Sequence, residues 1–314
     1  MPALAAGLDY IDLNFLGQSG VIATGLLHGP QGVALIDPGP STTLPQLMAA
    51  LASRGFASTD VRAILLTHIH LDHAGCTGVL MDLCPNTTVY VHESGAPHLI
   101  DPSKLVASAS RLYAPDMEKL WGEIRPVPPE RVTSMGTRTE NRSALRLAPI
   151  SVVGHDLEVA WTPGHAWHHV SYFSRATGIA FVGDTAGICR QSGRVVLPPT
   201  PPPDIDLDAW RTSTDLILNW NPGTLFLTHF GPQSVPRVHF QDLWKRMDEW
   251  SRRVQALLAQ PGLEDEHARA FTTWVMDDLV RATNPTEAAG YQAAARFDFS
   301  WSGLARYWRK KATS

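Results

Sequence analysis

The feature that most constrains this sequence is a block of nine residues that holds three histidines and an aspartate. The block is Thr67-His68-Ile69-His70-Leu71-Asp72-His73-Ala74-Gly75. It follows residues 61–66, an apolar run short enough to be a buried strand, so its polar side chains lie at the end of that strand. On an extended backbone His68 and His70 point to the same side and can reach one ion. Asp72 and His73 follow as the chain begins to turn, and because adjacent side chains on a turn diverge, they suit a second ion.

A chance cluster is the alternative interpretation, in which the histidines lie on a polar loop and Asp72 caps a helix that begins near Ala74. With 13 histidines among 314 residues, independent draws would give this pattern in roughly one chain in a thousand. We therefore interpret the block as a metal site. Imidazole and carboxylate groups bind zinc and also iron or manganese, so the motif alone does not choose the metal.

Three later apolar runs end in the same way, with a histidine or an aspartate shortly after the strand-like run. Residues 156–161 lead to His165, residues 179–182 lead to Asp184, and residues 224–227 lead to His229. Any one of these three residues alone would more often serve as a structural hydrogen-bonding group than as a metal ligand. Their placement at successive strand ends reverses that expectation, because together with the first block they supply enough ligands for two ions.

In this order the motifs resemble the metallo-β-lactamase fold superfamily, and specifically its glyoxalase II-like hydrolases. In that superfamily a His-x-His-x-Asp-His block, a later Gly-His, a Gly-Asp and a final His hold two metal ions at one edge of an αββα sandwich. The resemblance covers about residues 10–235. It implies that the first ion is held by His68, His70 and His165, the second by Asp72, His73 and His229, and that Asp184 bridges the two.

The resemblance implies hydrolysis of an ester, a thioester or a lactone. Two divalent ions about 3.5–4 Å apart share a water, lower its pKa toward neutrality and so provide a bridging hydroxide as the nucleophile. We expect these ions to be zinc, with iron or manganese as alternatives. Asp72 and Asp184 are the expected catalytic carboxylates, since Asp72 can orient the water or accept a proton and Asp184 bridges the ions. Two other activities of the same fold stay open, a mononuclear-iron persulfide dioxygenase and a phosphodiesterase or nuclease.

Two residues are expected to support the ligands without binding an ion. Asp37 follows the strand-like run 32–36, where it either holds the turn or orients a metal-binding histidine through a hydrogen bond. His169 matches a position that a supporting histidine occupies in glyoxalase II-like proteins. Its neighbour His168 has no counterpart there, and we expect it to face solvent or to lie behind the ligands.

The expected substrate pocket draws on segments farther from the metal block. Residues 96–125 form a predicted helical insertion with an apolar stripe. The large members of this stripe include Tyr113, Met117 and Trp121. Such a stripe is most often core, but its position one strand beyond the metal block makes it a candidate wall of the pocket. Arg190 and Arg194 are candidate contacts for a substrate anion, with exposed surface arginines as the alternative.

The remaining patterns predict an α/β fold, an αββα sandwich with a helical C-terminal extension. Strand-like runs and helical stripes alternate through residues 1–235, which we assign to the catalytic domain together with the insertion at 96–125. The proline-rich stretch 197–204 is expected to be a stiff connector, and it can also form one wall of the cleft. After residue 235 helical stripes replace the alternation, and we assign residues 236–314 to the extension.

One helix of the extension has an apolar face that needs a partner surface. Its large apolar residues include Phe240, Trp244, Met247 and Trp250. A helix with this much apolar surface must pack on the sandwich, on a second copy of the chain, or on both. We expect packing on the catalytic domain together with a contribution to a homodimer.

Charge and cysteine content set the expected partners and compartment. A net charge of −4 argues against nucleic acid, which usually needs a basic face, and favours a small-molecule substrate. The first residues lack a basic start followed by an apolar run, and no window is apolar enough for a membrane span. Three cysteines are too few for a disulfide framework. We therefore expect a cytoplasmic protein.

Overall fold

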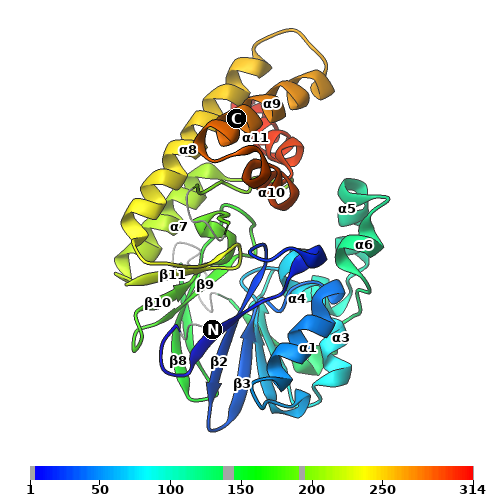
Figure 1. The fold of residues 1–314 in the computed structure, drawn as a ribbon, viewed down its shortest axis with the longest axis vertical. Coiled ribbons are helices and arrows are strands. Elements are labelled where there is room, and N and C mark those ends of the chain that lie inside the picture. The colour runs from blue at the N-terminus through cyan, green and yellow to red at the C-terminus, as the bar shows by residue number, and fades with distance from the viewer. Residues whose placement is uncertain (1–3, 137–144, 191–194, 314) are drawn as a thin grey trace.

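Two six-stranded β-sheets packed face to face form the centre of the molecule (Figure 1). The computed structural model describes residues 4–136, 145–190 and 195–313. In the first sheet the strands lie in the order β1 (Leu8–Asp12), β2 (Ala23–Gly29), β3 (Gly32–Ile36), β4 (Val61–Leu65), β5 (Thr88–His92) and β6 (Val132–Met135). In the second sheet the order is β12 (Gly231–Gln233), β11 (Thr224–Leu227), β10 (Ile179–Phe181), β9 (Val170–Ser174), β8 (His155–Trp161) and β7 (Arg146–Val152).

Helices cover the outer face of each sheet, which confirms the predicted αββα layering. On the first sheet these helices are α1 (Leu44–Ala52) and α3 (Thr77–Leu83). On the second sheet they are α7 (Leu207–Asn219) and the first part of α8 (Pro236–Leu258). The short helix α2 (Leu71–Ala74) lies within the metal block. Three further helices form the insertion: α4 (Ala96–Ile100), α5 (Ser103–Tyr113) and α6 (Met117–Trp121).

Strand β3 shows why the strands of this chain read as apolar runs. Val33 and Leu35 belong to the core under the helices, whereas Ala34 and Ile36 belong to the core between the sheets. Side chains alternate between the two faces of a strand, and here both faces are buried. A strand covered on both sides needs apolar residues at every position rather than at every second one.

The strand directions bring the predicted ligands to one edge of each sheet. β3, β4 and β5 pair in parallel. β8 and β10 each pair antiparallel with β9, and β10 pairs parallel with β11, so β8, β10 and β11 run in one direction. Strands that run in one direction end at the same edge of their sheet. Residues placed directly after these strands are therefore neighbours in space although they are far apart in the chain.

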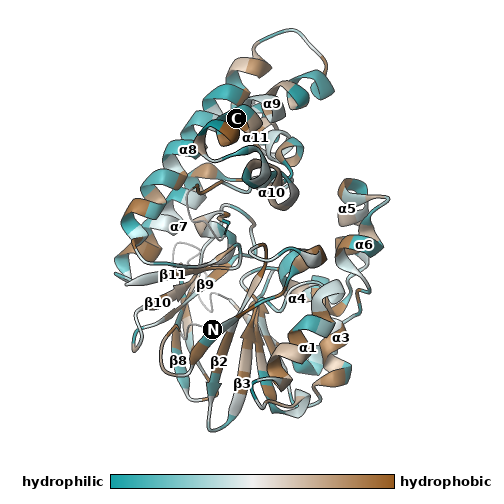
Figure 2. Ribbon diagram, in the orientation of Figure 1, coloured by the Kyte–Doolittle hydropathy of each residue, from teal (hydrophilic) through white to brown (hydrophobic). Residues whose placement is uncertain are grey.

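The C-terminal helices form a core of their own beside the sandwich (Figure 1). They are the second part of α8 and the helices α9 (Glu264–Ala282), α10 (Pro285–Ala295) and α11 (Phe297–Ala312). Trp250 on α8 lies with its ring 5.4 Å from that of Phe271 on α9 and 5.8 Å from that of Phe297 on α11. Hydrophilic and hydrophobic residues alternate along α8 (Figure 2), as expected for a helix with one covered face.

The apolar face of α8 is covered within the chain. Phe240 packs in the core under the second sheet, and Met247 and Trp250 pack among the C-terminal helices, all three being buried. Trp244 packs against the same helical core while partly exposed. The homodimer stays a prediction, which light scattering of the chain at high concentration tests.

Three smaller expectations concern the chain outside the site. The described helices include none that combines the length and the apolar content needed to cross a membrane. Cys76, Cys84 and Cys189 are buried and form no disulfide. Arg194, a candidate anion contact, lies outside the described residues.

Candidate metal centre

The predicted ligands lie after the strands that share one edge. His68 follows β4, and α2 begins at Leu71, so Asp72 and His73 stand on the first turn of that helix. Segments after β8, β10 and β11 carry the remaining ligands. The structure brings all seven side chains into three overlapping groups, in each of which the candidate ligand atoms lie within 4.8 Å of one another. These groups are His68, His70 and His165; His68, His73 and Asp184; and Asp72, His73 and His229.

Three imidazoles meet at Nδ1 of His70. Nε2 of His68 lies 2.9 Å from this atom, and Nε2 of His165 lies 3.0 Å from it. Nδ1 of His165 donates to the carbonyl oxygen of Pro199 at 2.8 Å, so in the neutral ring Nε2 presents a lone pair. Nδ1 of His68 likewise donates to the Thr67 hydroxyl at 3.1 Å, because that hydroxyl gives its own proton to a carboxylate. A proton on His70 could satisfy only one of the two lone pairs, whereas a bound cation satisfies both.

Asp184 lies between two groups of histidines. Its Oδ2 is 3.4 Å from Nε2 of His165. Its Oδ1 is 3.3 Å from Nε2 of His73 and 3.7 Å from Nε2 of His229. Asp72 completes the second group, with Oδ2 3.2 Å from Nε2 of His229. One oxygen of Asp184 thus faces each group, so this carboxylate could contact an ion held by either one.

Three buried atoms of this cluster have no hydrogen-bond partner in the described part of the chain. They are Nε2 of His73, Oδ1 of Asp184 and Nε2 of His229. The two nitrogens face this same oxygen at 3.3 and 3.7 Å without hydrogen-bond geometry. Imidazole nitrogen and carboxylate oxygen are the atoms that a divalent cation such as zinc binds. The donor set therefore fits the two ions that the motifs imply.

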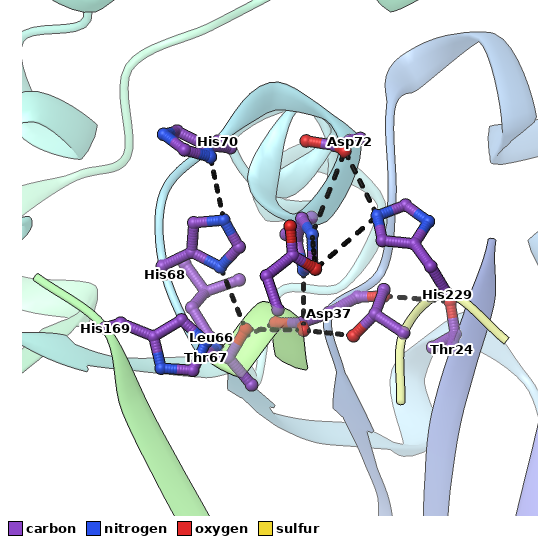
Figure 3. A network of polar contacts seen from close by, with 12 residues as sticks. Thr24, Asp37, Leu66, Thr67, His68, His70, Asp72, His169 and His229 are labelled. Carbon is purple, nitrogen blue, oxygen red and sulfur yellow. Dashed lines mark hydrogen bonds and ion pairs between the residues drawn. The ribbon is translucent and has the colours of Figure 1, made fainter. Parts of the chain in front are cut away.

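Asp37 supports the second group from behind (Figure 3). Its Oδ2 accepts hydrogen bonds from Nδ1 of His73 at 2.8 Å and from the hydroxyls of Thr67 and Thr228 at 2.7 Å each. Its Oδ1 accepts from the backbone N–H of Thr67 at 2.8 Å. The residue is buried and has a φ of 52°, a left-handed conformation that non-glycine residues adopt only at a cost. Asp37 thus stands at the turn after β3 and also fixes the tautomer of His73, as carboxylates behind ligating histidines do.

The two threonines are supporting residues that the sequence analysis missed. Thr67 precedes His68 and Thr228 precedes His229, and both hydroxyls bind the same oxygen of Asp37. The repeated Thr-His pair after a strand was the available signal. It ties the ends of β4 and β11, one from each sheet, to a single buried carboxylate.

His169 and His168 take different positions beside His68. His169 is buried, with Nδ1 2.9 Å from the Thr162 hydroxyl and 3.2 Å from that of Thr185, and its ring lies 5.0 Å from that of His68. His168 is partly buried and lines the cavity over the ligands, with its ring 6.1 Å from that of His68. His168 is therefore a cavity residue, a position that the sequence analysis did not foresee.

The two histidine groups differ in their affinity for protons. Burial lowers the pKa of His68 well below its usual range, and neighbouring imidazoles lower it further. Burial also lowers the pKa of His165 to about 4, although Asp184 opposes the shift. Burial acts in the same direction on His73, but Asp184 and two further carboxylates outweigh it and raise the pKa of His73 well above its usual value. The pKa of His229 is raised as well, because Asp184 and a second carboxylate outweigh burial.

Comparison with known protein families identifies the superfamily of this chain. A family model described as the metallo-beta-lactamase superfamily matches residues 18–229, a span that ends at the last ligand. The chain belongs to this superfamily. The match does not distinguish a glyoxalase II-like member from other members.

Individual relatives of the superfamily are distant in sequence. The chain is 28% identical over 173 residues to the probable metallo-hydrolase M6_Spy0554 of Streptococcus pyogenes serotype M6, and 27% identical over 172 residues to the metallo-beta-lactamase fold-containing protein ST1585 of Sulfurisphaera tokodaii. These alignments cover 55% and 54% of this chain and 64% and 60% of the relatives, less than two thirds of either.

Two solved structures match over nearly the whole chain and show the same fold. The metallo-beta-lactamase family protein TTHA1429 of Thermus thermophilus has a TM-score of 0.71 at 23% identity, covering 99% of this chain and 95% of that one. ST1585 from Sulfolobus tokodaii has a TM-score of 0.65 at 21% identity, covering 95% and 98%. Both matches extend through the C-terminal helices, so these helices lie within the shared fold.

A cavity of about 290 Å³ opens over the ligands. Its floor is formed by His70, Asp72, His165 and Asp184. Most of its wall residues come from three separate segments: helices α5 and α6, the proline-rich stretch at 199–204, and the junction of α10 and α11. Figure 1 shows α5 and α6 standing opposite α10. The edge of the two sheets that carries the ligands thus forms the floor of the cavity, and helices on either side form its walls.

Two of the four residues predicted for the substrate pocket line the cavity and two do not. Tyr113 and Trp121 line the cavity. Met117 is absent from the lining and packs, partly buried, against the core under the first sheet. Arg190 is also absent from the lining, and its side chain is directed to α10, with Nε 4.0 Å from a carboxylate oxygen of Glu287. The proline-rich stretch, by contrast, contributes five residues: Pro199, Pro201, Pro202, Pro203 and Asp204.

The C-terminal extension supplies wall residues that the sequence analysis did not name. Arg296 and Phe299 line the cavity together with Ala294 and Ala295. The guanidinium of Arg296 lies 4.3 Å over the Phe299 ring and binds Asp298 through two nitrogens at 2.8 and 3.1 Å. No local motif marks these residues, because their position depends on how the extension packs across the sandwich.

Proposed function

We propose that this chain is a dinuclear metal-dependent hydrolase that acts on an ester, a thioester or a lactone. The observation that carries the proposal is the position of Asp184. It lies between two histidine groups at the floor of a cavity, with one oxygen toward each group. Membership of a superfamily with a probable metallo-hydrolase among its relatives supports the same class of reaction.

In this proposal the residues divide into two sets of ligands and one shared carboxylate. The sets are His68, His70 and His165 for one ion and Asp72, His73 and His229 for the other, with Asp184 common to both. Zinc is the proposed metal, with iron or manganese as alternatives, because these donors suit all three. Two bound divalent ions would supply a water of lowered pKa and would polarise a substrate oxygen.

Asp72 has the proposed role of orienting the attacking water or accepting its proton. Its side chain is 26% exposed, compared with 4% for Asp184, so it is the more accessible of the two carboxylates. Burial raises the pKa of Asp72, but His73 and His229 outweigh burial and lower this pKa to about 2. The carboxylate is therefore ionised at neutral pH and can accept a hydrogen bond from water at the cavity floor.

The cavity walls support a substrate with an apolar portion. The apolar wall residues include Leu105, Leu112, Trp121, Ile188 and Phe299 and four prolines. Small-molecule sites are typically apolar with a few polar groups that fix orientation, and here those polar groups lie at the floor. We therefore expect the scissile carbonyl at the floor and an alkyl or aryl group against the walls.

A hydrolysis screen tests the proposal. The metal-loaded chain and a chelated sample are compared on thioesters, lactones, aryl esters, phosphodiesters and β-lactams that carry small or large apolar groups. We expect turnover of an ester, thioester or lactone, faster with the larger apolar group, lost on chelation and restored by the metal. Turnover of phosphodiesters alone, or oxygen uptake with glutathione persulfide by a one-iron sample, would replace the proposal by one of its alternatives.

A further inference from the structure

Tyr113 occupies a special place in the cavity, because it connects the wall to the floor. It is the last residue of α5 and lines the cavity together with the floor residues Asp72 and Asp184. Its ring lies edge-on to Trp121, with centroids 5.0 Å apart at 84°, and edge-on to Phe299, with centroids 5.3 Å apart at 82°. Tyr113 is thus held between the insertion and the C-terminal extension, and two aromatic contacts limit the directions its hydroxyl can take.

The hydroxyl of Tyr113 has no hydrogen-bond partner in the part of the chain that the structure describes. The fully buried tyrosines of this chain are different. The hydroxyl of Tyr172 donates to the carbonyl oxygen of Leu66 at 2.8 Å, and that of Tyr291 donates to the carbonyl oxygen of Val195 at 2.7 Å. A buried tyrosine usually has such a partner. Tyr113 is only partly buried and lines the cavity, so its hydroxyl is free to give a hydrogen bond to a molecule bound there.

The surroundings of Tyr113 keep this hydroxyl a donor. Burial raises the pKa of Tyr113 above its usual value, and the nearby carboxylate of Asp72 raises it further, while Arg296 acts in the opposite direction. The group is protonated across the neutral range and does not give up its proton to the floor carboxylates. It can give a hydrogen bond to an oxygen that gains negative charge.

Two cationic side chains of the cavity wall, Arg296 and Lys104, are less suited than Tyr113 to give this hydrogen bond. Arg296 binds Asp298 through two nitrogens, which takes up much of its hydrogen-bonding capacity. Lys104 is exposed, with its charged group on a long flexible stem. Tyr113 alone among these three combines a fixed ring with an unpaired donor.

We propose that the Tyr113 hydroxyl is a catalytic hydrogen-bond donor to the carbonyl oxygen of the scissile bond. The inference rests on the proposed hydrolase function. With a volume of about 290 Å³ the cavity is at the small end of ligand sites, so an acyl group that reaches the floor also meets Tyr113. Water adds to the carbonyl carbon, the bond to the leaving group breaks, and the leaving group takes a proton from that water. Tyr113 keeps its own proton throughout and stabilises the charge on the oxygen between the two events.

The test is the variant Tyr113→Phe in the full-length, metal-loaded chain. Phenylalanine keeps both ring contacts and removes only the hydroxyl. Removing one donor of this kind reduces kcat by roughly 100-fold to 1,000-fold in well-studied hydrolases. We expect a smaller loss here, of at least about tenfold, because a bound metal ion would also stabilise the charge on this oxygen. KM, the bound metal and the melting temperature should stay close to those of the unmodified chain. A tetrahedral phosphonate analogue of the substrate should lose affinity in parallel with kcat/KM, whereas the carboxylate product should not.

Tyr307→Phe is the matched control. Its hydroxyl bonds Asp208 on α7 at 3.4 Å and lies outside the cavity lining, so turnover should be unchanged. Turnover of Tyr113→Phe within threefold of the unmodified chain, with unchanged phosphonate affinity, would overturn the role of Tyr113 and leave the hydrolase proposal standing. If the unmodified chain hydrolyses none of the substrate classes, both proposals fall together.

Discussion

The floor and the walls of the cavity are built in different ways. The floor consists of histidines and aspartates placed after strands, and each ligating imidazole with a fixed tautomer is held by a carbonyl, a hydroxyl or a carboxylate behind it. The walls consist mainly of apolar side chains from three separate segments, joined by ring contacts such as that between Tyr113 and Phe299. The contrast indicates that the reaction type is set by the floor and the choice of substrate by the walls. The two should therefore respond separately to mutation.

Removal of the shared ligand should have the largest effect. Asp184→Ala is expected to lose at least one ion and to reduce turnover on the order of a thousandfold or more, because its oxygens face both histidine groups. Metal analysis and kcat are the measurements. Asp204→Ala changes another carboxylate of the cavity lining and should keep both ions. A variant at Asp184 that keeps two ions and near-normal turnover would show that this residue does not bridge.

A change behind the floor should have a smaller effect on the metal. Asp37→Asn removes the charge that fixes His73 while preserving the side-chain shape, and such supporting carboxylates are typically worth about 10-fold to 100-fold in metal affinity. Competition with a chromophoric chelator measures the affinity for each ion. Thr24→Val, whose hydroxyl donates only to the backbone carbonyl of Asp37, is the control. Equal metal affinity in Asp37→Asn and the unmodified chain would mean that Asp37 serves only the turn.

The two ions should differ in how strongly their binding depends on pH, because the two histidine groups differ in their affinity for protons. The raised pKa values of His73 and His229 mean that, without metal, these rings hold protons above pH 6.5, and an ion must displace them. Each displaced proton makes the affinity rise about tenfold per pH unit in that range. The group containing His165, with its pKa of about 4, should bind with little dependence on pH near neutrality. Calorimetric titration in two buffers counts the released protons, and zero release for both ions would contradict the assignment.

Changes in the walls should affect the substrate and leave the metal in place. Phe299→Ala is expected to raise KM for large acyl groups by roughly tenfold or less, with two ions still bound, because it removes apolar contact area. A loss of metal in this variant would break the separation of floor and walls.

Trp121→Ala should affect both substrate binding and stability. The residue lines the cavity, but it is also buried and stacked on Phe15 with ring centroids 5.9 Å apart. We expect it to lower the free energy of unfolding by about 3–5 kcal/mol in addition to changing KM. Thermal unfolding of the variant and of the unmodified chain measures this loss, and an unchanged melting temperature would show that Trp121 contributes only to the wall.

The floor, the insertion and the proline-rich wall could be predicted from the sequence, but the wall formed by α10 and α11 could not, for a physical reason. The ligands follow strands, and parallel strands end at one edge of a sheet. The position of local motifs such as Thr67-His68 and Thr228-His229 therefore follows from the strand that precedes each of them. The αββα layering follows from the same apolar runs. Phe299 and Arg296 reach the cavity only through the packing of α10 and α11, more than one hundred residues beyond Asp184. Arg190, close to Asp184 in the sequence, is directed to α10 instead.

The central claim is that the seven predicted ligands hold two ions as one unit. Metal analysis of the purified full-length chain tests this claim most directly. Samples loaded with zinc, manganese or iron are stripped of loosely bound metal, and the ions per chain are counted alongside hydrolytic turnover. The account predicts close to two ions per chain, with activity that disappears on chelation and returns with the second ion. A single tightly bound iron per chain, unchanged under saturating zinc or manganese, would contradict it and favour the dioxygenase alternative.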